Sequence, residues 1–226
     1  MRHEANSDND QNAAYHDPFL RSDSPVEIHE RHLPHWQLDG AFYFVTWRLT
    51  DSLPQDKLRR WRDEKSVWLE NHPYPWDSAT RLDYRRLFPQ RIERWLDQGY
   101  GSCHLRDVEC SQRVAEAILH FDHVRYDIGN FVVMPNHVHT LFQLRGTHKV
   151  EDVLGSWKGY SAAQINKYLG RSGALWQQEN WDRLMRSMNN LVRCFSYIKN
   201  NPAEANINSG EFYYFEAPDF LPEIYR

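Results

Sequence analysis

Residues 126–144 read YDIGNFVVMPNHVHTLFQL, and the rest of the predicted fold is arranged around this segment. Two runs of β-forming residues, 126–134 and 137–144, are separated only by Pro135 and Asn136, a pattern typical of a β-hairpin. The second run contains His137 and His139. Side chains two residues apart lie on one face of a strand, whereas on a helix they diverge by about 200°. A hairpin would therefore let both imidazoles reach a single metal ion.

The segments around this hairpin predict an α+β domain. We expect a strand at 41–50 and helices at 54–70, 82–96, 150–169 and 191–201. A further helix should begin at Ser111, and Pro202 should end the helix at 191–201. The order of strand, helices, hairpin and helices favours an antiparallel or mixed sheet over a doubly wound parallel one. A chain of 226 residues suits one core. We expect a disordered acidic tail at 1–28, one catalytic domain at 29–205 and a C-terminal extension at 206–226.

The net charge of −4 is unevenly distributed along the chain. Both ends are acidic, whereas residues 156–199 contain seven basic and two acidic side chains, a net charge of +5. Tryptophan and tyrosine residues are interleaved with these charges. Such a stretch suits a groove that pairs with phosphates and stacks bases, although a solvated helical face is an equal alternative. The candidate DNA-binding residues are Lys158, Arg183, Arg193 and Lys199.

Several classes of protein are disfavoured. No stretch approaches the roughly 20 apolar residues of a spanning helix, so we expect no membrane partner. Three unpaired cysteines suit the reducing cytoplasm. The sequence contains no Gly-rich phosphate loop, which argues against a nucleotide cofactor. A second histidine group, His29, His32 and His35, is a weak metal candidate because Pro34 disfavours the helix that would align it.

The helix at 191–201 carries a candidate nucleophile. Its apolar arc consists of Leu191, Phe195 and Ile198, and Tyr197 lies about 110° from the centre of that arc, so its hydroxyl can reach outward. Asn201 follows four residues later on the same side, and its amide oxygen could complete a metal site with His137 and His139. Two imidazoles and one oxygen leave positions open on an octahedral Mg²⁺ or Mn²⁺. The alternative is a packing tyrosine and a helix-capping asparagine.

The strings VVMPNHVH (132–139) and SYIKNNP (196–202) resemble the REP-associated tyrosine transposases, IS200-like single-tyrosine enzymes of the HUH class. The resemblance also includes HLPHW (32–36), LTDSLP (49–54), SWKG (156–159), GALWQ (173–177) and WDR (181–183), and spans about 31–205. It implies a ferredoxin-like antiparallel sheet with helices packed on one face, the HUH endonuclease core. It also implies that Tyr197 attacks DNA to form a 5′-phosphotyrosine.

The implied substrate is single-stranded DNA bearing a small hairpin, as at repetitive extragenic palindromes (REP). The resemblance suggests a bacterial, nucleoid-associated enzyme that works as a monomer, although related transposases form dimers that exchange the tyrosine helix. Two alternatives stay open: a hairpin-binding module that no longer cuts, and a phosphodiesterase that uses water in place of Tyr197.

Overall fold

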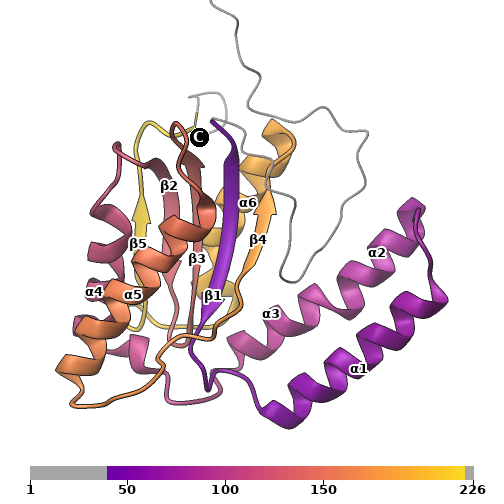
Figure 1. Ribbon diagram of the computed structural model, residues 1–226, viewed down its shortest axis with the longest axis horizontal. Coiled ribbons are helices and arrows are strands. Elements are labelled where there is room, and N and C mark those ends of the chain that lie inside the picture. Colours follow the sequence, from indigo (N-terminus) through magenta and orange to yellow (C-terminus); the bar gives the residue numbers. More distant parts are fainter. Residues whose placement is uncertain (1–39, 222–226) are drawn as a thin grey trace, which may run out of the picture.

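The computed structural model describes residues 40–221, which form a five-stranded sheet with helices on both faces (Figure 1). The strands are β1 (Phe42–Arg48), β2 (Tyr126–Val133), β3 (His137–Leu144), β4 (Trp181–Leu184) and β5 (Tyr213–Glu216). Their order is β4-β1-β3-β2-β5, and every neighbouring pair is antiparallel. The predicted α+β class is confirmed. The tail at 1–28 and the candidate trio His29, His32 and His35 lie outside the described residues.

The first four strands follow the ferredoxin-like pattern. Chain order is β1, α4 (Val108–Leu119), β2, β3, α5 (Val150–Tyr168), β4, and the spatial order of these strands is 4-1-3-2. The hairpin of β2 and β3 has the predicted position, with its turn at Pro135 and Asn136. Two short edge strands were not predicted. Of these, β5 belongs to the segment expected as an extension and pairs with β2.

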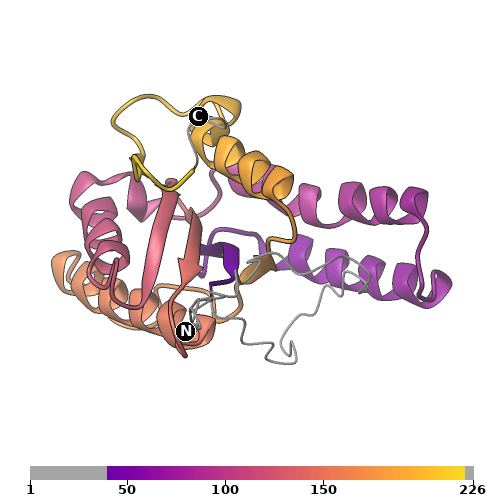
Figure 2. The same cartoon turned by 90° about the horizontal axis from the view of Figure 1, so that it is seen from above.

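Both faces of the sheet are buried. All seven side chains of β1 are buried: Tyr43, Val45 and Trp47 pack with α4 and α5, whereas Phe42 and Phe44 pack with α6 (Met188–Glu204). Figure 2 shows α6 on the opposite side of the sheet from α4 and α5. The expectation of helices on one face is therefore wrong. The apolar residues on both faces of β1 require a second covering layer.

Between β1 and α4 the chain forms a helical arm that extends away from the sheet (Figures 1 and 2). It consists of α1 (Gln55–Asn71), α2 (Ser78–Leu87) and α3 (Pro89–Asp97), followed by the short 3₁₀ helix η1 (His104–Arg106). The single helix predicted at 82–96 is thus two helices, because Pro89 begins a new helix as its first residue. The arm has a small aromatic core of its own, against which Trp181 of β4 packs.

Two helix boundaries differ from prediction. The helix α4 begins at Val108 because the Asp107 carboxylate caps it, accepting from the Glu109 backbone N–H at 2.8 Å. The helix α6 does not end before Pro202 but continues to Glu204, with Pro202 in its last turn. A proline there removes only one hydrogen bond near the helix end. Asn201 is consequently a helical residue rather than a cap. No helix among residues 40–221 is long and apolar enough to cross a membrane.

Candidate active site

Two histidines lie side by side at the beginning of β3. His137 and His139 project from the same face of the strand, toward α6, and the Nε2 atoms of their rings are 3.1 Å apart. Both side chains are buried, with 1% of each residue exposed. The hairpin therefore brings the predicted histidine pair together as the two-residue spacing required.

Neighbouring side chains determine which ring nitrogen carries the proton. The Asn136 amide Nδ2 donates to the carbonyl oxygens of Leu96 and Tyr100, at 3.2 and 3.1 Å, so its Oδ1 faces His137 and accepts from Nδ1–H at 2.7 Å. The Nε2 of His137 then has a lone pair and accepts from the Nε2–H of His139. His139 Nδ1 in turn accepts from the Thr46 hydroxyl at 2.7 Å. Asn136 and Thr46, neither predicted as a site residue, thus orient both rings.

Both imidazoles are neutral at pH 7. Burial lowers the pKa of His137 to about 3. Burial lowers the pKa of His139 well below its usual value, and His137 lowers it further. Neutral imidazole is the form that binds metals, so no proton has to be displaced from a charged ring.

The residues present fit a divalent metal ion. Two nitrogens that each lie about 2.1 Å from one ion are about 3.0 Å apart at a right angle and about 3.4 Å apart at a tetrahedral angle. The observed 3.1 Å suits the right angle of a six-coordinate ion. Asn201 supplies a further observation: it is 1% exposed, and its Oδ1 has no hydrogen-bond partner within residues 40–221. A buried amide oxygen without a partner is costly, and a metal ion would satisfy it.

Tyr197 lies over the histidine pair. Its hydroxyl is 3.5 Å from His139 Nε2, and its ring packs edge-on against His139 and Phe44, with centroid distances of 5.3 and 5.9 Å. The Asn130 amide holds α6 in place by donating to the Phe195 carbonyl at 2.9 Å. The hydroxyl therefore faces the histidines rather than solvent. A hydroxyl and two neutral imidazoles thus lie together, and the Asn201 amide follows Tyr197 on the same helix; side chains of these types can bind a metal ion or act as a nucleophile.

Three acidic side chains act electrostatically on the tyrosine hydroxyl. Burial raises the pKa of Tyr197 far above its usual value near 10, and Glu93, Asp97 and Glu204 raise it further, whereas Arg183 opposes them. Burial, followed by repulsion from Glu93 and Glu204, also raises the pKa of Asp97 to about 6. The tyrosinate form is thus disfavoured in the free protein. These carboxylates come from α3 and the end of α6, and no sequence pattern linked them to Tyr197.

Comparison with known proteins shows a similarity in the middle of the chain. Residues 104–200, a little under half of the chain, match the family model described as "Transposase IS200 like". Over these residues the chain is similar to the IS200-like transposases. The match includes His137, His139 and Tyr197 and ends just before Asn201. A comparison with curated proteins gave no match.

Two solved structures are similar to this chain at low identity. One is the REP-associated tyrosine transposase bound to a REP hairpin, with 14% identity, 77% of this chain and 74% of the other covered, and a TM-score of 0.38. The second is a protein of Deinococcus radiodurans R1 assigned to the transposases. It has 13% identity, 76% and 98% coverage of the two chains and a TM-score of 0.32.

The four candidate DNA-binding residues lie on three different elements, α5, β4 and α6. Arg183, on β4, is exposed and acts electrostatically on Tyr197. Lys158, on α5, donates to the Gln178 carbonyl at 3.0 Å beside the loop that precedes β4. Lys199 forms an ion pair with Glu216 of β5 at 3.0 Å, and Arg193 is exposed on α6. Of these four residues, only Arg183 has an electrostatic effect on the pKa of Tyr197.

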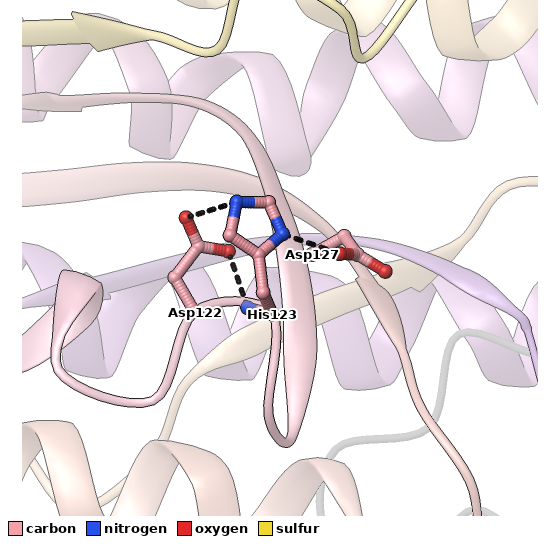
Figure 3. Close-up of side chains that lie close together, drawn as sticks. All are labelled: Asp122, His123 and Asp127. Carbon is pink, nitrogen blue, oxygen red and sulfur yellow. Dashed lines mark hydrogen bonds and ion pairs between the residues drawn. The ribbon is translucent and has the colours of Figure 1, made fainter.

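A second group of side chains that could hold a metal ion consists of Asp122, His123 and Asp127 (Figure 3). It lies at the opposite end of the β2–β3 hairpin from His137. Its carboxylates already have partners: Asp122 accepts from two backbone N–H groups, and Asp127 accepts two hydrogen bonds from Arg145 at 2.6 Å. The His123 side chain is 73% exposed. These contacts stabilise the turn between α4 and β2, which accounts for the cluster without a metal.

Proposed function

We propose that this chain is an IS200-like transposase, a metal-dependent endonuclease and strand transferase that acts on single-stranded DNA through a covalent 5′-phosphotyrosine. The observation that carries the proposal is the position of the Tyr197 hydroxyl, 3.5 Å from Nε2 of His139. His139 and His137 are both neutral, and Thr46 and Asn136 orient their rings. The buried, unpartnered Oδ1 of Asn201 on the same helix supports a third ligand position.

His137, His139 and Asn201 would hold the ion, either Mg²⁺ or Mn²⁺, which when bound would polarise the scissile phosphate. Tyr197 attacks phosphorus through its Oη, so that a bond from phosphorus to the tyrosine oxygen forms and the bond to the 3′-oxygen breaks. The 3′-oxygen leaves as a hydroxyl after taking up a proton, and the phenol loses its proton. Attack by another 3′-hydroxyl reverses these steps. The phosphodiester is conserved, and no nucleotide cofactor is needed.

The substrate class follows from the sequence motifs at 132–139 and 196–202. These motifs resemble those of REP-associated enzymes, so we propose single-stranded DNA that carries a REP-like hairpin as the partner, in the bacterial cytoplasm at the nucleoid. We also propose that the protein works as a monomer, because Tyr197 reaches the histidines of its own chain. The competing function is a hairpin-binding module that no longer cuts; nothing in the positions of Tyr197 and the histidines favours it.

The test is incubation of the purified full chain with labelled single-stranded DNA containing repeats from its own genome, with Mg²⁺ or Mn²⁺, followed by denaturing electrophoresis. We expect a protein-linked DNA band that is absent with Tyr197→Phe and with a chelator. Hydrolysis that persists in Tyr197→Phe would indicate a phosphodiesterase that uses water. Tight binding without cleavage across all repeats tested would indicate the binding module.

A further inference from the structure

A buried arginine lies beside the histidine pair at the end of β1. Arg48 is directly opposite His137 in the β1–β3 register, and Thr46, two residues earlier, reaches His139 from the same face. Arg48 therefore points to the histidine face, where directly opposed side chains begin about 5 Å apart. It is 2% exposed. Its Nη1 donates to Ser52 Oγ at 3.3 Å, and its guanidinium carbon lies 5.6 Å from the centre of the Trp181 ring.

This cation has no ion pair with a carboxylate of residues 40–221. Burial lowers its pKa to about 10, which reflects the cost of a charge removed from water. A buried charge without a partner is rare unless a ligand completes the site. Trp181 and Ser52 are neutral and do not balance the charge.

Two further cations, Lys158 of α5 and Arg62 of α1, interact electrostatically with Arg48. The backbone N–H of Gln177 donates to the Arg48 carbonyl at 2.9 Å, and Lys158 of α5 donates to the carbonyl of the next residue, Gln178. Burial lowers the pKa of Lys158 to about 8, and Arg48 lowers it further. The exposed Arg62 of α1 also acts on Arg48. Strand β1, the helical arm and α5 thus each contribute one positive charge.

One carboxylate, that of Glu179, acts electrostatically on all three cations. Glu179 stabilises the charged forms of both Arg48 and Lys158. It is exposed, it lies in the segment 177–180, which has no regular secondary structure, and its Oε2 accepts from Gln177 Nε2 at 2.5 Å. One negative charge among three positive ones leaves an excess of two. Guanidinium groups match phosphate oxygens in geometry, and a lysine adds a point charge.

We propose that Arg48, Arg62 and Lys158 form a subsite for a backbone phosphate of the DNA next to the histidine pair, and that the Glu179 carboxylate holds this place until DNA binds. The inference rests on the proposed function, because it takes single-stranded DNA as the ligand. An incoming phosphate replaces Glu179 as the group that balances the charge of Arg48. The phosphate then provides Arg48 with an ion-pair partner, which no carboxylate of residues 40–221 supplies.

The experiment measures binding of a short, labelled single-stranded oligonucleotide by fluorescence anisotropy over a range of KCl concentrations. The full chain carries Tyr197→Phe and is kept in chelator, so no cleavage interferes. Glu179→Gln is expected to tighten binding about three- to tenfold, because one competing negative charge is removed. The matched control is Glu70→Gln, the same change at an exposed position on α1, and its affinity should equal that of the parent.

The second variant is Arg62→Gln, an exposed position whose loss does not threaten folding. It should weaken binding and reduce the slope of log K against log[KCl] by about 0.7, the value for one phosphate contact on a single strand. Unchanged affinity in Glu179→Gln, or an unchanged slope in Arg62→Gln, would overturn the subsite. The test of the subsite is separate from the electrophoresis test of the proposed function. If both variants change DNA binding but no protein-linked DNA band forms, only the proposed function is contradicted. If the band forms but neither variant changes DNA binding, only the subsite is contradicted.

Discussion

The hydroxyl of Thr46 offers a sharp test of the metal site. In the free protein it donates to His139 Nδ1 at 2.7 Å, and His139 Nε2–H points at His137. To bind a metal through Nε2, His139 must move its proton to Nδ1, and only a group that can also accept will satisfy that N–H. A hydroxyl donates in one state and accepts in the other. Thr46 therefore lets the tautomer change at little cost.

Thr46→Val keeps the shape of the side chain but removes this partner. In the metal-bound state a buried Nδ1–H is then unsatisfied, which costs about 1–3 kcal/mol, and the cost is larger there than in the free protein because the ion polarises the ring. The expected loss of Mn²⁺ affinity is about 10- to 100-fold, the usual effect of removing such a partner. Thr46→Ser, which retains the hydroxyl, is the control and should bind Mn²⁺ almost as well as the wild type.

The assay is titration of the metal-free protein with Mn²⁺, followed by calorimetry or by the electron paramagnetic resonance signal of free Mn²⁺. A circular dichroism melt shows that each variant is folded. Equal Mn²⁺ affinity in Thr46→Val and Thr46→Ser would refute the tautomer argument. A loss in both variants would show that the hydroxyl alone does not account for the effect and that packing of the methyl group contributes as well.

Three further predictions concern α6, α3 and β4. Asn201→Ala should leave the metal-free protein as stable as the wild type, because it removes an unpartnered buried oxygen, yet should abolish most of the rise in melting temperature caused by Mn²⁺; a full rise would exclude Asn201 as a ligand. The pKa of Asp97 is higher in the folded than in the unfolded state, so its contribution is present below pH 3.8 and is lost as pH rises through about 6. Asp97→Asn should therefore exceed the wild type in unfolding free energy at pH 8 by about 1–2 kcal/mol, after allowance for partial exposure, with no gain near pH 4; urea titrations that show equal differences at both pH values would contradict this. Arg183→Gln should reduce the salt slope of single-strand binding by about 0.7, whereas Arg86→Gln, which removes a guanidinium paired with Asp83, should leave it unchanged.

The sequence predicts the parts of the site that depend on local spacing. The hairpin, the shared face of His137 and His139, and the helix that carries Tyr197 each follow from patterns within about ten residues. The two edge strands were missed because four-residue strands such as β4 are too short to show alternation. The break at Pro89 was missed because the apolar stripe continues from α2 into α3.

The residues that orient the histidines depend on contacts between distant segments. Thr46 and His139 are 93 residues apart, and the Asn136 amide bonds to the end of α3, 40 residues earlier. One pattern could have indicated Thr46, and Arg48 with it: these are the polar residues in the otherwise apolar strand FYFVTWR, and both lie on the face of the histidines. A polar side chain at a buried strand position usually has a specific partner.

Mass spectrometry of the trapped complex shows whether Tyr197 itself becomes linked to DNA. The protein is incubated with single-stranded REP-like DNA and Mn²⁺, denatured, digested with nuclease and protease, and analysed for peptides that carry a nucleotide. We predict a nucleotide attached through a 5′-phosphate to Tyr197, in a peptide from α6. Attachment to any other residue, or cleaved DNA with no modified peptide, would contradict the proposed chemistry.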